Sequence, residues 1–535
     1  MKLKYIFYIT TLTAVLFSAG CSRDFGDINQ DPTRVTEATI PSLITSLESN
    51  INGRDFTFLA IELDYPASQL FAKVRDIGVD PIDRTSNAAW AGYYSFLADY
   101  RKLEETFENY PSNQDRLVNV KAIAKTLAAF RTMNNLDVYG DMPYAGAGYA
   151  FVSSNQIFRP VYDKQADIYS AVLTDLKWAS DNYTTATLNG SGEAIVSPGA
   201  NDVFYAGAIA KWQKLTNSLL LKTAIKIYDK DAATASPIIA DLLNNNKPLL
   251  VDGEDWKIAP STTGTNRSFQ PSFRAANSCG ARMGNTIWNL LSSSTTLADT
   301  SGANIFDYRA KVFFEKNAYG SWYPAPQNTI VTDDFGDVYV NGRRNNPANN
   351  RSRYSAINIF LVTDNVNVPD IYLTAAEVYF LKAEAYARGM GVSKNWATAE
   401  TNYKAGIASS VNFWSAVGQS LQLWAAGTGK PAAATATDIS TIQNNSKVMF
   451  LGTDSEAQKL SKIYAQHWLS LFWQPWDAYY LMRRTLQTPQ TVAYNSDYYR
   501  VIYPQAEIGD NKTNYDAAVA AMGGDTKSIK LWWMK

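Results

Sequence analysis

Histidine and cysteine are scarce in this chain, which has 535 residues but only one histidine, His467, and two cysteines, Cys21 and Cys279. A histidine-rich metal site is therefore excluded, and a Ser-His-Asp arrangement would have to use His467 as its base. Aromatic and apolar residues surround His467 in the segment HWLSLFW, which is typical of a structural histidine on a helix. Cys279 has no cysteine nearby, which argues against a structural zinc site.

The chain also lacks an excess of charge of either sign. Lys and Arg number 49 and Asp and Glu number 50, which gives a formal net charge of -1. A protein that binds nucleic acid has a basic surface, so this balance argues against a nucleic-acid partner. After the N-terminus no apolar run reaches the ~20 residues that a membrane-spanning helix needs. With 46% hydrophobic and 19% charged residues, the composition is that of an ordinary globular protein.

The N-terminus has the organisation of a signal peptide. A basic start, MKLK, is followed by an apolar run over residues 5–17 and by small residues directly before Cys21. This pattern resembles a bacterial lipoprotein signal, in which Cys21 becomes the lipidated N-terminus; an ordinary secretory signal with an incidental cysteine is the alternative. We therefore expect a signal peptide at 1–20, a tether at 21–38 and one domain at 39–535.

Apolar residues recur at helical spacing in several segments that come in pairs with short connections. We expect helices at 117–136, 164–180, 202–228, 371–387, 396–411 and 457–473, and a further helix that begins at Pro475. The pair over 371–411 has about the 34-residue length of a tetratricopeptide unit. Long stretches rich in Gly, Ser, Thr, Asn and Pro, at 248–304 and 318–369, are predicted to be irregular loops, which at this length are usually functional or disordered. We expect 425–445 to be a surface excursion.

Seven motifs, in order along nearly the whole chain, resemble those of the SusD/RagB-like lipoprotein family. They are INQDPTRVTEATIPSL (28–43), DVYGDMPY (137–144), PVYDKQADIYSAVLTDL (160–176), KWQKLTNSLLLKTAIKI (211–227), LTAAEVYFLKAEA (373–385), HWLSLFWQPWDAYYLMRRT (467–485) and RVIYPQAEIGDNKTNY (500–515). The resemblance implies an all-α, SusD-like fold: a tetratricopeptide-like scaffold of helical pairs with long irregular loops and small strands.

The resemblance also implies a function and a location. Members of the family are outer-membrane lipoproteins that face the cell exterior, bind oligomeric nutrients, usually glycans, and deliver them to a SusC-like TonB-dependent barrel transporter. No cofactor and no metal is implied. A peptide-binding lid of the same type of transporter is the first alternative, and a surface glycoside hydrolase and a purely protein-binding repeat adaptor are the others.

Carboxylates are the remaining route to an enzyme, because a glycosidase needs only two of them. Glu377 and Glu384, seven residues apart, lie on one face of a predicted helix. Pairing with basic side chains of neighbouring helices is the stronger interpretation. Asp333, Asp334 and Asp337 would suit a hard cation such as Ca²⁺, but they do not follow the EF-hand spacing, and a solvated acidic loop is favoured. We therefore predict a binding protein without catalytic activity.

Aromatic residues point more directly to a binding site. The chain contains 14 Trp, 32 Tyr and 23 Phe, of which most must be core. A ring in a polar loop can instead carry the apolar C–H face of a sugar, while Asn and Arg bond its hydroxyls. In the two regions where family members often place ligand aromatics, the candidates are Arg84, Asn87, Trp90, Tyr93, Trp288, Trp322 and Tyr323. Packing in the core is the alternative for each ring.

Replacing Cys21 with alanine tests the lipid anchor. The variant lacks the sulfur that would carry the lipid, so we expect release from membranes or stalled processing. Fractionation of cells grown with radiolabelled palmitate should place label in the membrane-bound protein of the wild type only. Membrane association that stays the same without label would contradict the lipoprotein interpretation.

Overall fold

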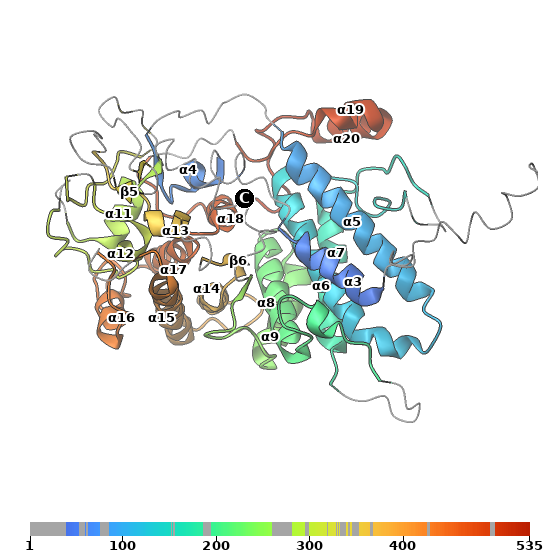
Figure 1. Cartoon of the computed structure of the whole chain (residues 1–535), viewed down its shortest axis with the longest axis horizontal. Coiled ribbons are helices and arrows are strands. Elements are labelled where there is room, and N and C mark those ends of the chain that lie inside the picture. Colours follow the sequence, from blue (N-terminus) through green and yellow to red (C-terminus); the bar gives the residue numbers. More distant parts are fainter. Residues whose placement is uncertain are drawn as a thin grey trace, which may run out of the picture.

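The structure is a computed structural model that describes residues 39–52, 59, 63–74, 85–150, 152, 156–185, 194–258, 281–294, 299–317, 319–327, 329, 331, 339–340, 343–344, 353–363, 368–424, 429–492 and 498–534. These residues form mostly helices, which confirms the predicted all-α fold. The helices gather into two groups that stand side by side (Figure 1), and each group encloses a hydrophobic core.

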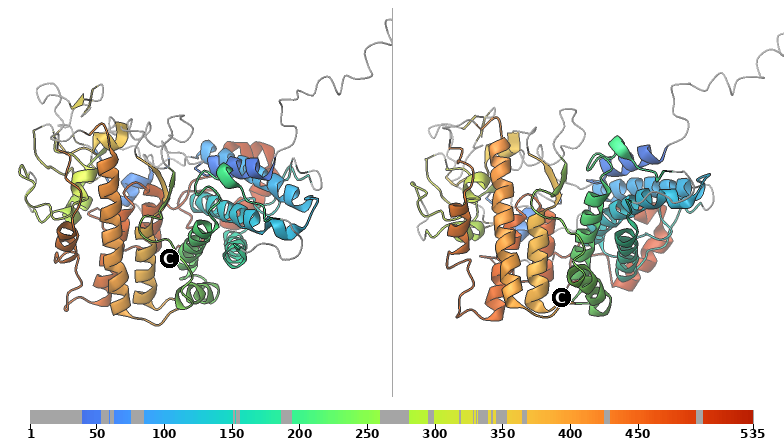
Figure 2. Two further views of the ribbon diagram at one scale, coloured as in Figure 1. Left: turned by 60° about the horizontal axis from the view of Figure 1, so that its bottom comes forward. Right: turned by 90° about the horizontal axis from the view of Figure 1, so that it is seen from below.

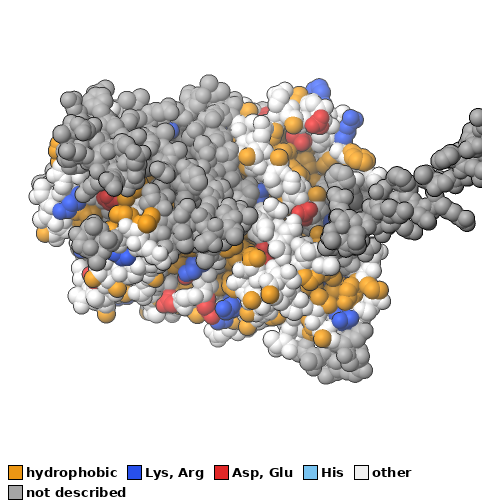
Figure 3. Space-filling view, viewed as in Figure 1, with side chains coloured by type: hydrophobic (Ala, Val, Ile, Leu, Met, Phe, Trp, Pro, Cys, Tyr) orange, Lys and Arg blue, Asp and Glu red, His pale blue; other side chains and the backbone are white. Residues whose placement is uncertain are grey.

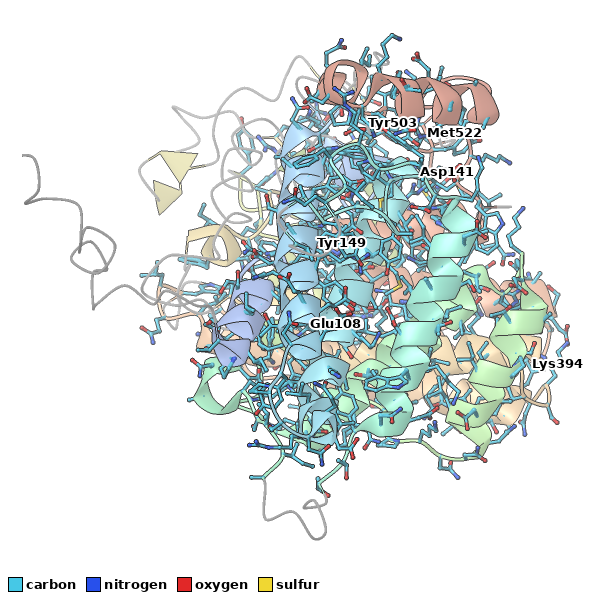
Figure 4. All side chains as sticks on the ribbon, turned by 90° about the vertical axis from the view of Figure 1, so that its right-hand side faces the viewer. Glu108, Asp141, Tyr149, Lys394, Tyr503 and Met522 are labelled. Carbon is cyan, nitrogen blue, oxygen red and sulfur yellow. The ribbon has the colours of Figure 1, made fainter. Side chains whose placement is uncertain are left out.

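The first group lies on the right of Figure 1 and contains most of the N-terminal half. Its helices are α3 (Ile40–Ser49), α5 (Asn87–Glu108), α6 (Val118–Tyr139), α7 (Gln165–Asn182), α8 (Ile209–Ile227) and α9 (Ala232–Asn244), with the 3-10 turns η2 (Gln114–Leu117) and η3 (Gly199–Asn201). The C-terminal helices α19 (Gln505–Asp510) and α20 (Lys512–Met522) lie above the end of α5. Tyr503 lies beside Met522 below them (Figure 4), and its hydroxyl donates to the carbonyl of Asp141.

The second group contains the short helices and loops of the middle of the chain together with three long helices. Its helices are α4 (Tyr65–Ser68), α11 (Asn285–Leu291), α12 (Ala310–Phe313), α13 (Ile359–Thr363), α14 (Ala375–Arg388), α15 (Trp396–Ser420), α16 (Ala436–Gln443), α17 (Glu456–Ser470) and α18 (Pro475–Thr485). Helices α14, α15 and α17 stand nearly parallel, side by side (Figure 2). This arrangement matches the paired-helix scaffold that the sequence predicts.

Strands contribute little to the described part of the chain. Three antiparallel pairs are present: β1 (Ala72–Lys73) with β3 (Ala281–Arg282), β2 (Trp256–Ile258) with β6 (Asp370–Leu373), and β4 (Tyr339–Val340) with β5 (Arg343–Arg344). On the face shown in Figure 3, acidic and basic side chains are interspersed, in keeping with the net charge of -1. No helix within the described residues is long and apolar enough to cross a membrane.

Helix α14 is shared by the two cores. Ala376, Phe380 and Ala383 pack in the core of the second group. Val378 and Leu381, on the other face of the helix, pack in the core of the first group. The small residues let α15 approach closely: a Cβ atom on Gly406 of α15 would lie 2.9 Å from the ring of Phe380. A helix buried on both faces forms the wall between the two groups.

The structure corrects three of the predicted boundaries. The helix expected over 371–387 begins only at Ala375, because Ile371–Leu373 belongs to β6 and Thr374 caps the helix by accepting from the Glu377 amide. The helix expected from 202 begins at Ile209, because the Asp202 carboxylate accepts three backbone amides and holds 202–208 in a turn. The expected excursion at 425–445 contains α16, which starts with a capping box.

Three other predicted helices are present, with bounds that differ from the predicted ones mainly at their C-terminal ends. Pro475 begins α18, as predicted from its tolerance in the first turn. The helix expected to stop at residue 411 continues to Ser420 as α15. The helix predicted at 457–473 is α17, which is capped by Ser455 and ends three residues earlier than predicted, at Ser470.

Candidate functional site

The N-terminal candidates lie at the start of α5. Asn87 is exposed, but Trp90 is only 6% exposed, and its ring centroid is 4.8 Å from that of Tyr139 and 5.6 Å from that of Tyr503. Tyr93 is fully buried, and its hydroxyl lies 3.2 Å from that of Thr132. In this structure both rings pack in the core of the first group and present no exposed face. Arg84 lies outside the described residues.

The other three candidates lie in the second group. Trp288, on α11, is 2% exposed and stacks on Trp322, with ring centroids 6.5 Å apart and planes 15° apart. Trp322 is 8% exposed and is held by backbone hydrogen bonds to Asp299 of 2.8 and 2.9 Å. Tyr323 turns to the other side of this extended segment, where its hydroxyl accepts from Arg353 at 3.1 Å.

The structure does not bring the two candidate regions together. Trp90 and Tyr93 belong to one hydrophobic core, and Trp288 and Trp322 belong to the other. Helices α5 and α11, which carry Trp90 and Trp288, lie at opposite ends of the molecule (Figure 1). A single ligand contact area that includes both regions is therefore not formed by the described residues.

Trp322 does line a surface pocket, which we call the Trp424 pocket. Its volume is about 330 Å³, and the lining side chains that matter here are Trp322, Phe360, Trp424, Lys311, Glu315 and Lys316. Phe360 and Trp424 stack on each other with centroids 5.6 Å apart and planes 13° apart. Phe360 is half-buried, so part of its ring remains accessible. A pocket of roughly 300 Å³ is at the small end of the range for ligand sites.

Charged groups complete the rim of this pocket. Lys311 is exposed, and the Lys316 ammonium donates to the carbonyl of Thr300 at 2.7 Å. The carboxylate of Glu315 accepts from the backbone amide of Ile359 at 2.6 Å, which fixes the start of α13. Aromatic faces beside hydrogen-bonding side chains suit a ring that is apolar on its faces and polar at its edge. This is the chemistry of a sugar.

Gly302 is required for the shape of the pocket. Its φ is +75°, and a Cβ atom there would lie 2.9 Å from the indole nitrogen of Trp322. Any other residue would be strained in this conformation and would push Trp322 out of position. The loop over 299–302 therefore holds the ring of Trp322, one of the candidates predicted from the sequence, in position.

Phe360 and Trp424 were not predicted from the sequence. Trp424 directly precedes the Ala-, Thr- and Gly-rich stretch at 425–445, which suggests a position near the surface, but its side chain is only 4% exposed. Phe360 gives no such signal, because INIFLVT is apolar and is equally typical of core. The pocket forms only when the end of α15 and α13 meet the loop around Trp322, a contact between distant parts of the chain.

The two carboxylates of the glycosidase alternative are engaged in buried ion pairs. Glu384 accepts from Arg484 at 2.6 Å with both oxygens, and from Arg388 at 2.8 Å. Burial alone would raise the pKa of Glu384, but the two guanidinium groups lower it to about 2. Glu377 lies 2.8 Å from the Lys222 ammonium and 3.8 Å from His467, and its pKa is likewise about 2 against the effect of burial. The predicted pairing with neighbouring helices is confirmed, and a general acid would need the opposite shift.

Neither metal ligands nor a triad come together elsewhere in the described chain. Within those residues, no group of three His, Cys, Asp or Glu side chains is arranged to hold a metal ion. The acidic cluster of Asp333, Asp334 and Asp337 lies outside the described residues, as do Cys21 and Cys279.

Known proteins resemble this chain in sequence pattern and in fold. Residues 35–504 match a family described as SusD-like, starch-binding and associating with the outer membrane. Solved structures of similar fold are a chitin-binding protein (20% identity, TM-score 0.69), a SusD homologue from Bacteroides fragilis (21%, 0.68) and a SusD-like protein from Bacteroides thetaiotaomicron (18%, 0.64). Each of the three matches covers 93% of this chain. It covers 100% of the chitin-binding protein, 100% of the Bacteroides fragilis protein and 99% of the Bacteroides thetaiotaomicron protein. No curated protein matches the sequence.

Replacing Glu384 with glutamine should destabilise the fold, because Arg484 would keep a buried charge without its partner. We expect a loss of about 3–5 kcal/mol in urea melts, as for other broken buried pairs. The pKa of Glu384 falls from 4.5 to about 2 on folding, so its contribution is present above pH 4.5 and is lost as pH falls toward 2. Between pH 4.5 and about 2, the stability of the variant should therefore fall less steeply than that of the wild type.

The control is Glu400→Gln, at an ion pair with Lys404 whose side chains are 38% and 45% exposed. It should change stability by no more than about 0.5 kcal/mol. Equal stability of Glu384→Gln and the wild type at pH 7 would contradict the ion-pair account.

Proposed function

This chain belongs to the SusD-like family, described as starch-binding and associating with the outer membrane, and on that basis we propose that it captures oligomeric nutrients, glycans foremost, in the Trp424 pocket. The observation that supports this choice is the stacked pair of Phe360 and Trp424 beside Trp322 in a pocket of about 330 Å³. Binding would be reversible and would need no cofactor and no chemical step.

We propose that each part of the pocket has a distinct role. The accessible ring of Phe360 carries the apolar face of a sugar, and Trp424 supports it from behind. Trp322 forms the wall, and Trp288 stacks behind Trp322 to hold it in place. Lys311, which is exposed at the rim, reaches the ligand hydroxyls. A role in binding for Arg84, Asn87, Trp90, Tyr93 and Tyr323 stays a prediction. Asn87, Trp90, Tyr93 and Tyr323 do not line the pocket, and Arg84 lies outside the described residues.

A lipid on Cys21 would hold the protein at the outer face of the outer membrane. The support for this part of the proposal is the signal-peptide pattern before Cys21 and the description of the family. Delivery to a SusC-like TonB-dependent barrel would follow capture. Several acyl chains would give stable attachment, because each buried methylene contributes about 0.8 kcal/mol.

Glycan is favoured over peptide by the chemistry of the pocket. Ring faces suit the C–H face of a sugar, whereas an extended peptide is recognised mainly through backbone hydrogen bonds to a strand edge. The described strands are two to four residues long, and none of them lines the Trp424 pocket. One structure of similar fold is a chitin-binding protein, which also supports a glycan.

Phe360→Ala tests the pocket by calorimetric titration against a panel of oligosaccharides and peptides. Loss of one aromatic contact should weaken glycan binding by about 0.5–1.5 kcal/mol, or a few-fold to roughly tenfold in Kd. No product should form during the titration. The matched control is Phe450→Ala, a half-buried ring of the same core that packs on Tyr403 away from the pocket.

Melting curves of both variants separate binding from folding. The proposal predicts similar losses of stability in the two variants and weaker binding only in Phe360→Ala. Unchanged glycan affinity in Phe360→Ala, or tight binding of peptides alone, would contradict it.

A further inference from the structure

A second cavity lies where α18 meets α5 and α6, apart from the Trp424 pocket. Its volume is about 50 Å³, and three guanidinium groups line it, those of Arg131, Arg483 and Arg500. Such a volume accommodates a few water-sized groups, because each needs roughly 10–15 Å³ by the same measure. No residue lines both this cavity and the Trp424 pocket.

Arg483 and Arg500 each keep a buried N–H group without an acceptor among the described residues. Arg483 is 4% exposed, and its Nη1 donates to the carbonyls of Asp137 at 3.1 Å and Tyr499 at 2.7 Å, while its Nε finds no partner in the described part of the chain. Arg500 is 2% exposed, and its Nε donates to the carbonyl of Tyr139 at 3.0 Å and its Nη1 to Asp525 at 2.5 Å, while its Nη2 has no partner within the described residues.

Three carboxylates line the same cavity, those of Asp64, Asp137 and Asp477, and each of them already has a partner. Asp137 accepts from the Lys226 ammonium at 2.5 Å and from the Tyr169 hydroxyl at 2.8 Å. Asp477 accepts from the Lys222 ammonium at 2.7 Å. Among the described residues no carboxylate forms an ion pair with Arg483, whose guanidinium instead lies 4.1 Å from the centre of the Tyr479 ring. Among the described residues, the Nε of Arg483 and the Nη2 of Arg500 therefore remain without an acceptor.

We propose that this cavity binds the carboxylate group of a small molecule through Arg483 and Arg500. A buried charged donor without an acceptor destabilises the folded protein more than a neutral one does. A carboxylate is the natural partner of a guanidinium group, since its two oxygens match the fork of N–H donors. A cavity of about 50 Å³ is large enough for a group of this size. The carboxylate would come from a free monocarboxylate or from an acidic sugar.

This proposal is independent of glycan capture at the Trp424 pocket. Acetate and galacturonate supply the two sources of carboxylate, with chloride at equal ionic strength and neutral galactose as the matched blanks. We expect the melting temperature to rise with the logarithm of acetate or galacturonate concentration above the dissociation constant, as for any ligand of the folded state. Chloride and galactose should leave it unchanged, and the more effective acid identifies the source.

Three variants locate the effect on the full-length protein. Arg483→Met removes the donor, and Ala89→Leu fills the cavity while keeping all three guanidinium groups, since Ala89 lines it and is 3% exposed. Both should abolish the carboxylate-dependent shift. Arg159→Met, at an exposed arginine that does not line the cavity, should retain it in full. If Arg483→Met fails to fold, Ala89→Leu decides alone.

The shift of the melting temperature in the wild type and in Ala89→Leu decides whether the carboxylate binds in this cavity. A shift with either acid that is lost in Ala89→Leu supports the proposal. Equal melting temperatures in acetate, galacturonate and chloride mean that the cavity holds only water, and they overturn it. A shift that persists in Ala89→Leu places the binding elsewhere and also overturns it.

Discussion

The buried ion pairs of α14 are the interaction on which the rest of the structure depends. Glu377 on its first turn meets Lys222 of α8, and Glu384 on its last turn meets Arg484 of α18. Lys222 also holds Asp477 of α18 at 2.7 Å. A charge in a core costs several kcal/mol unless it is paired, so these groups fix which helices surround α14. Helix α14 joins the two helical groups together with α18, whose Tyr479 and Met482 pack in the first core and whose Ala478 and Leu481 pack in the second.

The position of the Trp424 pocket follows from this scaffold. Helix α15 packs against α14, and Trp424 lies just beyond its end. A Cβ atom on Gly418 of α15 would lie only 3.4 Å from Val312 of α12, so α12, which precedes the segment that carries Trp322, is anchored close to the same helix. The pocket is thus built from irregular segments whose ends are fixed by regular ones. This is the usual way in which a helical scaffold presents a binding site.

Sequence reasoning succeeded where the determining contacts are local. The spacing of Ala376, Phe380 and Ala383 predicts the buried face of α14, because i, i+4 and i+7 neighbours share a face in any helix. It failed at Ile371–Leu373, where the apolar pattern continues the helical period although the strand partner, β2, is far away in sequence. The cap at Thr374 was the local signal for the true start.

The binding site was harder to predict for the same reason. Trp90 follows a turn-rich stretch and looks like a loop aromatic, but its neighbours Tyr139 and Tyr503 come from distant segments and bury it. Whether Trp322 lines a pocket depends on Phe360 and Trp424, which are equally distant in sequence. Composition identifies rings that can bind a sugar; only packing decides which of them remain accessible.

Native-state hydrogen exchange tests most directly whether α14 joins the two helical groups into one unit. The amides of α6 in the first group and of α15 in the second should exchange through the same global opening, with one free energy that equals the free energy of unfolding. If either helix exchanges at a clearly lower free energy while the other stays protected, the two cores open separately and the ion pairs of α14 do not couple them.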